Sequence, residues 1–322
     1  WFESIGGHHW MARRVPDDCY VVCPNQQGID VFDMNDAMGE KRENLCSADL
    51  LSFIRDNHLD PDMEEYDGLI GTRAIFGSRS DADHVYNTPR AWYMHRYLVP
   101  NACGWDGEDA RYRPDSDDLP WCMVPEKKVT LEDIKYVLSS HYQGTKYDPY
   151  AQYGDLSESG RFRPIGINRN NFVAVTQLRD YVGSEFMAVE WIACGSNVFN
   201  ALAPFYANVR RTPGYLADTS KRVTTENFYW ENRVIAALAD AHFHECHVHV
   251  ERYENEMMSL GHEHVAKTDR GAVDCPEAVE AYLEKANDEM AQVLKEKTDE
   301  LLDLVLYDAS VQMKNSFSRS DA

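Results

Sequence analysis

The sequence predicts an α+β fold, with stacked sheets and with helices on their outer sides. Predicted strands and helices follow one another in blocks, in the order strands, helices, strands, helices, and this order is typical of α+β proteins. The 322 residues are 43% hydrophobic, and a chain of this length can bury roughly three quarters of its unfolded surface. Because no internal repeat or Ser/Gly-rich linker marks a boundary, residues 1–322 are predicted to form a single domain.

The first block of strands begins at Trp1. Two short runs rich in aromatic and β-branched residues, WFESI and HHWMARRV, are separated by Gly6 and Gly7. This pattern predicts a β-hairpin with a two-residue turn. Residues 17–33 are predicted to form further strands. Because Trp1 would already lie inside a strand, we expect a further segment upstream of it.

Three helices are predicted in the next block, at residues 47–59, 88–99 and 130–142. Each has apolar residues at helical spacing, and the second has Pro89 in its first turn, where proline is favoured. Residues 101–127 are polar and contain Gly and Pro, so we expect a loop there.

The pattern then repeats, with strands predicted at residues 161–178 and 185–196. Two helical stretches follow, at residues 225–260 and from 276 to about 309, so the part from about 224 to 322 is mainly helical. Apolar residues form a stripe on the last helix, namely Val279, Leu283, Ala286, Met290, Val293, Leu301 and Leu304. We expect this stripe to pack on a sheet, and the alternative is a contact between subunits.

Acidic residues outnumber basic ones, which gives a net charge of −22. Such a charge repels phosphate backbones and anionic lipid surfaces, so no nucleic acid and no membrane is expected as a partner. No apolar run approaches the about 18 residues of a membrane-spanning helix. The eight cysteines contain no CxxC pair, which is typical of free thiols in a reducing compartment and predicts a cytoplasmic protein.

The histidine-rich run HFHECHVHVE, from His242 to His249, raises the alternative of a metal-dependent hydrolase. A helical zinc site of the HExxH type needs two histidines four residues apart, with a Glu after the first. Glu245 does follow His244, but position 248 is Val. We therefore predict no metal and no cofactor, and we keep this alternative open.

Two polar residues, Asn25 and Arg90, are the candidate catalytic residues. In the run CYVVCPN, Asn25 stands at the end of a predicted apolar strand. A carboxamide fixed at a strand end is the kind of donor that an oxyanion hole requires, although Asn after Pro is also a common turn residue. Arg90, in NTPRAW, lies in the first turn of a predicted helix, where an arginine is often only a surface charge.

Several long runs, in the same order, resemble the PepD-type dipeptidases. They are GGHHWMARRVPDDCYVVCPNQQGIDVFD, NTPRAWYMHRYL, DIKYVLSSHYQGTKYDPY, RPIGINRNN and GSNVFNALAPFYANV. These dipeptidases are N-terminal-nucleophile (Ntn) cysteine hydrolases, and they are similar at a distance to penicillin V acylases, bile-salt hydrolases and secernins. The resemblance runs from residue 1 to about 245 and continues more loosely to the end.

The resemblance implies a four-layer αββα sandwich with added C-terminal helices, of which this chain is the downstream portion. It also implies a nucleophilic N-terminal Cys in a segment upstream of Trp1, so that this chain alone is expected to be inactive. Asn25 then matches the oxyanion donor of the acylase relatives, and Arg90 matches an arginine that holds the nucleophile region.

The implied function is hydrolysis of small dipeptides, with the upstream segment as the partner that supplies the nucleophile. We also expect a homo-oligomer. Two alternatives stay open, namely the metal-dependent hydrolase built on His242–His249 and a non-catalytic fragment that serves assembly or binding.

Overall fold

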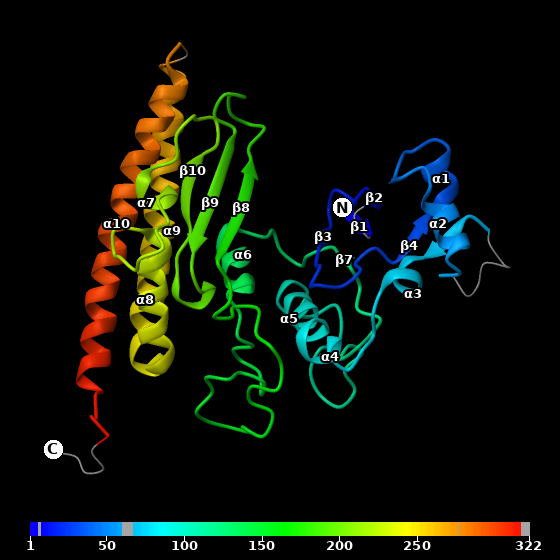
Figure 1. The fold of residues 1–322 in the computed structure, drawn as a ribbon, viewed down its shortest axis with the longest axis horizontal. Coiled ribbons are helices and arrows are strands. Elements are labelled where there is room, and N and C mark those ends of the chain that lie inside the picture. Colours follow the sequence, from blue (N-terminus) through cyan, green and yellow to red (C-terminus); the bar gives the residue numbers. More distant parts are fainter. Residues whose placement is uncertain (6–7, 60–66, 276, 317–322) are drawn as a thin grey trace. The chain divides into compact units, whose positions relative to one another are not determined.

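The computed structural model describes residues 1–5, 8–59, 67–275 and 277–316, and it contains both antiparallel sheets and helices (Figure 1). The α+β class that the sequence predicts is therefore confirmed. Contacts divide the chain into two compact units. The first comprises Trp1–Thr130 and Gly160–Pro164, and the second comprises Leu131–Ser159 and Ile165–Ala322. That residues 1–322 form one domain stays a prediction.

Short strands and short helices make up the first unit. Its strands are β1 (Phe2–Ile5), β2 (His9–Arg13), β3 (Tyr20–Val21), β4 (Val31–Asp33), β5 (Asn44–Cys46), β6 (Leu69–Gly71) and β7 (Cys122–Met123). Its helices are α1 (Met34–Met38), α2 (Leu50–Asp56), α3 (Thr72–Phe76), α4 (Asp83–Tyr86) and α5 (Thr88–Leu98).

The predicted hairpin at the start of the chain is confirmed. Strands β1 and β2 pair antiparallel, with Phe2 opposite Ala12 and Ile5 opposite His9. The turn at Gly6 and Gly7 lies outside the described residues. β5 pairs with the other edge of β2, and a small apolar core lies beneath, formed by Met11, Ile29, Phe32, Met34, Ala37, Leu50, Ile54, Ile70 and Trp121.

A single antiparallel sheet and the long helices form the second unit. The elements are α6 (Leu131–Leu138), β8 (Phe172–Leu178), β9 (Ala188–Cys194), the 3-10 helix η2 (Asn197–Phe199), β10 (Ala203–Tyr206), α7 (Gly214–Ala217), α8 (Phe228–Ala241), α9 (Phe243–Val273) and α10 (Val279–Val311). The strand order is β10, β9, β8. The strand predicted at 185–196 is confirmed over Ala188–Cys194, whereas the strand predicted at 161–178 is confirmed only over Phe172–Leu178 and is wrong before it. The sequence pattern predicts no strand at β10.

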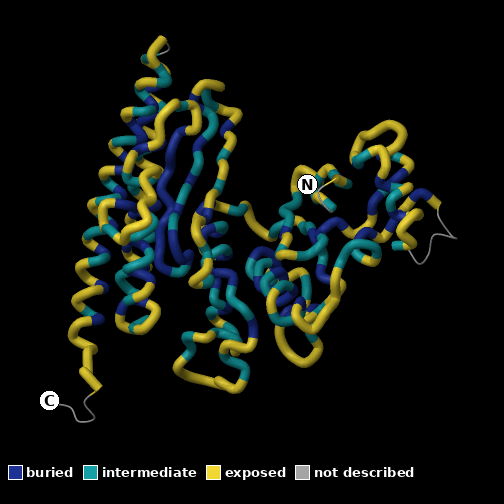
Figure 2. Tube along the Cα trace, viewed as in Figure 1, coloured by how far each residue is buried: buried dark blue, intermediate teal, exposed yellow. Residues whose placement is uncertain are grey.

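Helices α8, α9 and α10 lie together against β9 and β10 (Figure 1). Figure 2 shows buried residues along these strands and on the inner sides of the helices. Trp191, Val189 and Ala203 are almost fully buried there. The burial follows from the two-residue period of β9, whose alternate residues face the helices.

The prediction of one helical stretch over residues 225–260 is wrong in two respects. The helix begins only at Phe228, because Asn227 caps it with a side chain that accepts a hydrogen bond from the backbone N–H of Trp230. The helix then ends at Ala241, because His242 leaves the helical conformation. No Gly or Pro marks this break in the sequence, so the apolar spacing alone did not reveal it.

The predicted stripe on the C-terminal helix is correct at Leu283, Ala286, Met290 and Leu301, which are buried. It is wrong at Leu304, which is 47% exposed, because Val305 takes the buried position. The predicted start at residue 276 lies outside the described residues. Among the described helices, none is both long enough and apolar enough to cross a membrane.

Candidate active site

The candidate site is built where strand β3 ends. β3 is held by β7, and the pairing continues with a 2.9 Å hydrogen bond from the Val22 N–H to the Trp121 carbonyl. The chain then bends at Pro24, which has no N–H for a strand ladder. The prediction that the strand runs on to Asn25 is therefore wrong, and Asn25 is exposed in the bend that follows.

Arg90 lies in the first turn of α5, as the sequence predicts. Its Nη2 donates to the side-chain oxygen of Asn25 at 2.8 Å and to that of Asn87 at 2.6 Å, and its Nε donates to the Tyr86 carbonyl. The structure thus brings the two candidate residues, 65 positions apart in the chain, into direct contact.

The buried carboxylate of Asp83 positions Arg90 through Asn87, which contacts both of them. Asp83 accepts hydrogen bonds from Asn87 at 2.6 Å, from the Ser78 hydroxyl at 2.6 Å and from the Ser80 hydroxyl at 2.8 Å. Burial disfavours its ionised form, but the hydrogen bonds together outweigh burial and lower the pKa of Asp83 to about 2. Asp83 therefore fixes Asn87, and Asn87 fixes Arg90.

The contact with Arg90 defines the orientation of the Asn25 carboxamide. Because a guanidinium only donates hydrogen bonds, the atom that faces it must be the amide oxygen. The amide nitrogen, with two N–H groups, then points elsewhere, and no acceptor within the described ranges takes a hydrogen bond from it. Chemically, Asn25 is a positioned hydrogen-bond donor.

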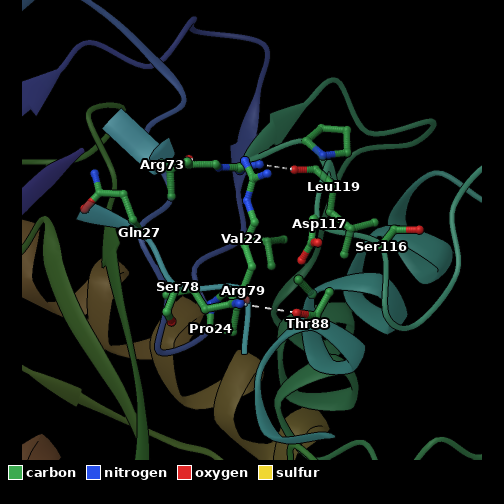
Figure 3. Close-up of a pocket in the computed structure, with 15 residues that line it drawn as sticks. Val22, Pro24, Gln27, Arg73, Ser78, Arg79, Thr88, Ser116, Asp117 and Leu119 are labelled. Atoms are coloured by element: carbon green, nitrogen blue, oxygen red, sulfur yellow. Dashed lines mark hydrogen bonds between the residues drawn. The ribbon is translucent and has the colours of Figure 1, made fainter. Parts of the chain in front are cut away.

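A small pocket lies beside this bend, and Pro24 lines it (Figure 3). Gln26, the other neighbour of Asn25, lines it as well. Gln26 donates from Nε2 to the Thr88 hydroxyl at 3.2 Å, which ties the bend to the start of α5. The pocket has a volume of about 50 Å³. Arg73 and Arg79 also line it, although the sequence alone did not single them out, since isolated arginines carry no motif.

His95, a buried residue of α5, contacts strand β3, and no pattern in the sequence identifies this contact. His95 accepts from the Tyr20 hydroxyl at Nδ1, at 2.7 Å, and its Nε2 lies 2.6 Å from the Pro120 carbonyl. Burial lowers the pKa of His95 to about 4. The ring is therefore neutral near pH 7 and serves to hold β3 against α5.

The histidine-rich run opens helix α9 in the second unit. His249 Nε2 lies 3.0 Å from a carboxylate oxygen of Asp308, and His247 bonds the His244 carbonyl at 2.9 Å. In the described part of the chain, no three His, Cys, Asp or Glu side chains are grouped so that they could hold a metal ion. With these side chains engaged in other contacts, the metal-dependent alternative is not favoured.

Comparison with known proteins defines the class of protein as a peptidase. The profile of peptidase family C69 matches residues 1–256, and the chain belongs to this family. The family assignment that the sequence motifs predict is thereby confirmed.

The relatives carry dipeptidase names. The chain is 48% identical over 360 residues to a dipeptidase of Bifidobacterium longum, covering all of this chain and 67% of the relative. It is 44% identical over 321 residues to a probable dipeptidase A of Streptococcus pyogenes serotype M18, covering 100% and 64%. It is 38% identical over 305 residues to dipeptidase A of Lactobacillus helveticus, covering 94% and 60%. The chain thus spans about two thirds of the length of these relatives.

Proposed function

We propose that the protein to which this chain belongs is a dipeptidase that cleaves the amide bond of small dipeptides. Membership of peptidase family C69 and the names of the relatives support this proposal. The proposal concerns the protein with a segment upstream of Trp1, because that segment is proposed to carry the nucleophilic N-terminal Cys.

In the proposed mechanism, one upstream residue supplies both nucleophile and base. The Cys sulfur attacks the carbonyl carbon of the dipeptide, and the α-amine of the same Cys, with an ordinary pKa of about 8, takes the thiol proton. The tetrahedral intermediate collapses, the C–N bond breaks, and the α-amine returns the proton to the leaving amine. Water then hydrolyses the thioester and releases the first amino acid.

The contact between Arg90 and Asn25 is the observation that carries the proposed roles of this chain's residues. Asn25 would donate from Nδ2 to the oxyanion, and this donor is oriented before the substrate arrives because Arg90 holds the opposite end of the amide. Arg90 acts through Asn25 and is a positioning residue in this proposal.

The proposed framework is the four-layer αββα sandwich of the Ntn hydrolases. The sheet β10-β9-β8 with α8, α9 and α10 packed against it supports one β layer and one α layer of such a sandwich. The cytoplasmic location and the homo-oligomer stay predictions.

The proposed function is tested by assaying the full-length protein for release of free amino acids from dipeptides, before and after alkylation with iodoacetamide. Loss of activity on alkylation, with no loss on treatment with a metal chelator, is expected. Hydrolysis that survives alkylation, or that a chelator abolishes and zinc restores, would replace the thiol mechanism with another one.

A further inference from the structure

The pocket beside the Asn25 bend is electropositive, in contrast to the chain as a whole. Two arginines, Arg73 and Arg79, line it together with a single acidic residue, Asp117. Asp117 already faces His84, with 2.8 Å between Oδ1 and Nε2, and this hydrogen bond raises the pKa of His84. The pocket thus keeps an excess of positive charge in a protein of net charge −22, and such an excess attracts an anion.

Arg73 is held in place by uncharged groups. Its Nε donates to the Gly28 carbonyl at 3.1 Å, and its Nη1 donates to the Leu119 carbonyl at 2.6 Å (Figure 3). These carbonyls orient the guanidinium without cancelling its charge. Within the described ranges Nη2 has no acceptor, so a donor pair remains available on a side chain that is already fixed.

Arg79 reaches the same pocket from the segment between α3 and α4. It is exposed and makes no hydrogen bond or ion pair within the part of the chain that the structure describes. Burial is the main cause that lowers the pKa of Arg73; Asp30 and Glu3, which do not line the pocket, raise it, and the nearby Arg79 lowers it by a smaller amount. Two cations at one cavity repel each other, and an anion between them removes that repulsion.

The size and the position of the pocket suit the end of a short peptide. A buried water needs roughly 10–15 Å³, so about 50 Å³ gives room for a group of a few heavy atoms, such as a carboxylate. In a dipeptide a single residue separates the scissile carbonyl from the terminal carboxylate, so the groups that bind them must lie close together. Pro24 and Gln26, the chain neighbours of Asn25, line the pocket, so the pocket lies beside the proposed oxyanion donor.

We infer that Arg73 and Arg79 bind the C-terminal carboxylate of the substrate and thereby place its peptide bond at Asn25. This inference rests on the proposed dipeptidase function and deepens it. It predicts a preference for dipeptides over longer or blocked peptides, because only a free carboxylate one residue beyond the scissile bond would reach the arginines. A carboxylate between two guanidinium groups forms charge-assisted hydrogen bonds, which a neutral amide does not.

The test compares a dipeptide that the full-length protein cleaves with the same dipeptide carrying a C-terminal amide. For the parent, kcat/KM should be about 10- to 100-fold lower for the amide, the range expected when a charge-assisted hydrogen bond is lost. In Arg79→Gln, kcat/KM for the free acid should fall about tenfold or more while that for the amide stays nearly unchanged. Arg79→Lys should restore part of the preference.

Arg42→Gln is the matched control, because Arg42 is an exposed arginine of the first unit that pairs with Glu40 away from the pocket. It should leave both substrates unaffected. Failure of the parent to cleave any dipeptide would overturn the proposed function. Cleavage of acid and amide at equal rates, or an unchanged preference in folded Arg79→Gln, would overturn the inference on the arginines and leave the dipeptidase proposal standing.

Discussion

Nη2 of Arg90 donates a 2.8 Å hydrogen bond to Oδ1 of Asn25, and this bond joins the first turn of α5 to the bend after β3. Arg90 is itself anchored by Asn87 and by the Tyr86 carbonyl. The bond therefore does more than link two segments of the chain. It determines which end of the Asn25 amide remains available as a donor.

Replacing Arg90 should lower the rate by loosening Asn25. In the full-length protein, Arg90→Gln is expected to reduce kcat about tenfold with little change in KM, because a preorganised donor acts mainly on the transition state. The double variant with Asn25→Ala should be little slower than Asn25→Ala alone, since both changes remove one function. Steady-state kinetics on the three variants check this. Losses that simply multiply would contradict a positioning role for Arg90.

Lys135 is a buried cation in the second unit whose removal should destabilise the fold. Its Nζ lies 2.6 Å from the Glu254 carboxylate and 2.8 Å from the Asn197 carbonyl, and its side chain is only 5% exposed. Lys135→Met leaves Glu254 without its cation and should lower the free energy of unfolding by about 3 kcal/mol. Lys285→Met, at an exposed pair with Glu289, should cost about 0.5 kcal/mol or less. Urea unfolding that shows equal losses would contradict this account.

Glu231 should make the stability of the second unit depend on pH. Burial is the main cause that raises its pKa to about 8, although the Tyr215 hydroxyl donates to it at 2.6 Å and Lys295 lies 3.9 Å away. Between the ordinary pKa of 4.5 and about 8, the unfolded chain releases this proton and the folded chain keeps it. Stability should therefore fall as pH rises through this window and change no further above it.

The variant Glu231→Gln provides the comparison, because glutamine resembles the protonated acid and does not titrate. Unfolding by urea at several pH values between about 5 and about 8 should show a smaller loss of stability in Glu231→Gln than in the parent. Identical pH profiles for the two proteins would show that Glu231 does not titrate in this window.

Neighbouring positions on α10 should respond very differently to truncation. Val305 is fully buried and Leu304 is 47% exposed. Val305→Ala should lower the free energy of unfolding by about 2 kcal/mol, whereas Leu304→Ala should change it by about 0.5 kcal/mol or less. Thermal or urea unfolding checks the pair. A larger loss at Leu304 would place the buried stripe where the sequence predicts it.

This pair also shows how far the sequence predicts the helices. Residues with apolar periodicity identify α10 and most of its buried face, but Thr298 interrupts the apolar pattern although it is fully buried. Its hydroxyl donates to the Leu294 carbonyl at 2.7 Å and contacts the Tyr253 hydroxyl at 2.9 Å. A polar residue whose hydrogen bonds are satisfied inside the core interrupts the apolar pattern, so the spacing does not show that Thr298 is buried.

The candidate site is likewise predicted only in part from the sequence. Motif resemblance identifies Asn25 and Arg90 one by one, but it does not reveal their contact, because that depends on how α5 packs against the bend after β3. Arg73 and Arg79 have no pattern at all in the sequence. Only the folded first unit places both arginines at one pocket, which a single acidic residue, Asp117, also lines.

The most direct test of the account is kcat of Asn25→Ala in the full-length protein, measured on soluble, folded enzyme with Asn57→Ala as the control. Asn57 is an exposed asparagine of the same unit whose amide bonds the Phe53 carbonyl. If Asn25 donates to the oxyanion, kcat should fall about 10²–10³-fold with KM nearly unchanged, while the control keeps the parental rate. A kcat within a few-fold of the parent would mean that Asn25 is an ordinary turn residue and would contradict the proposed active site.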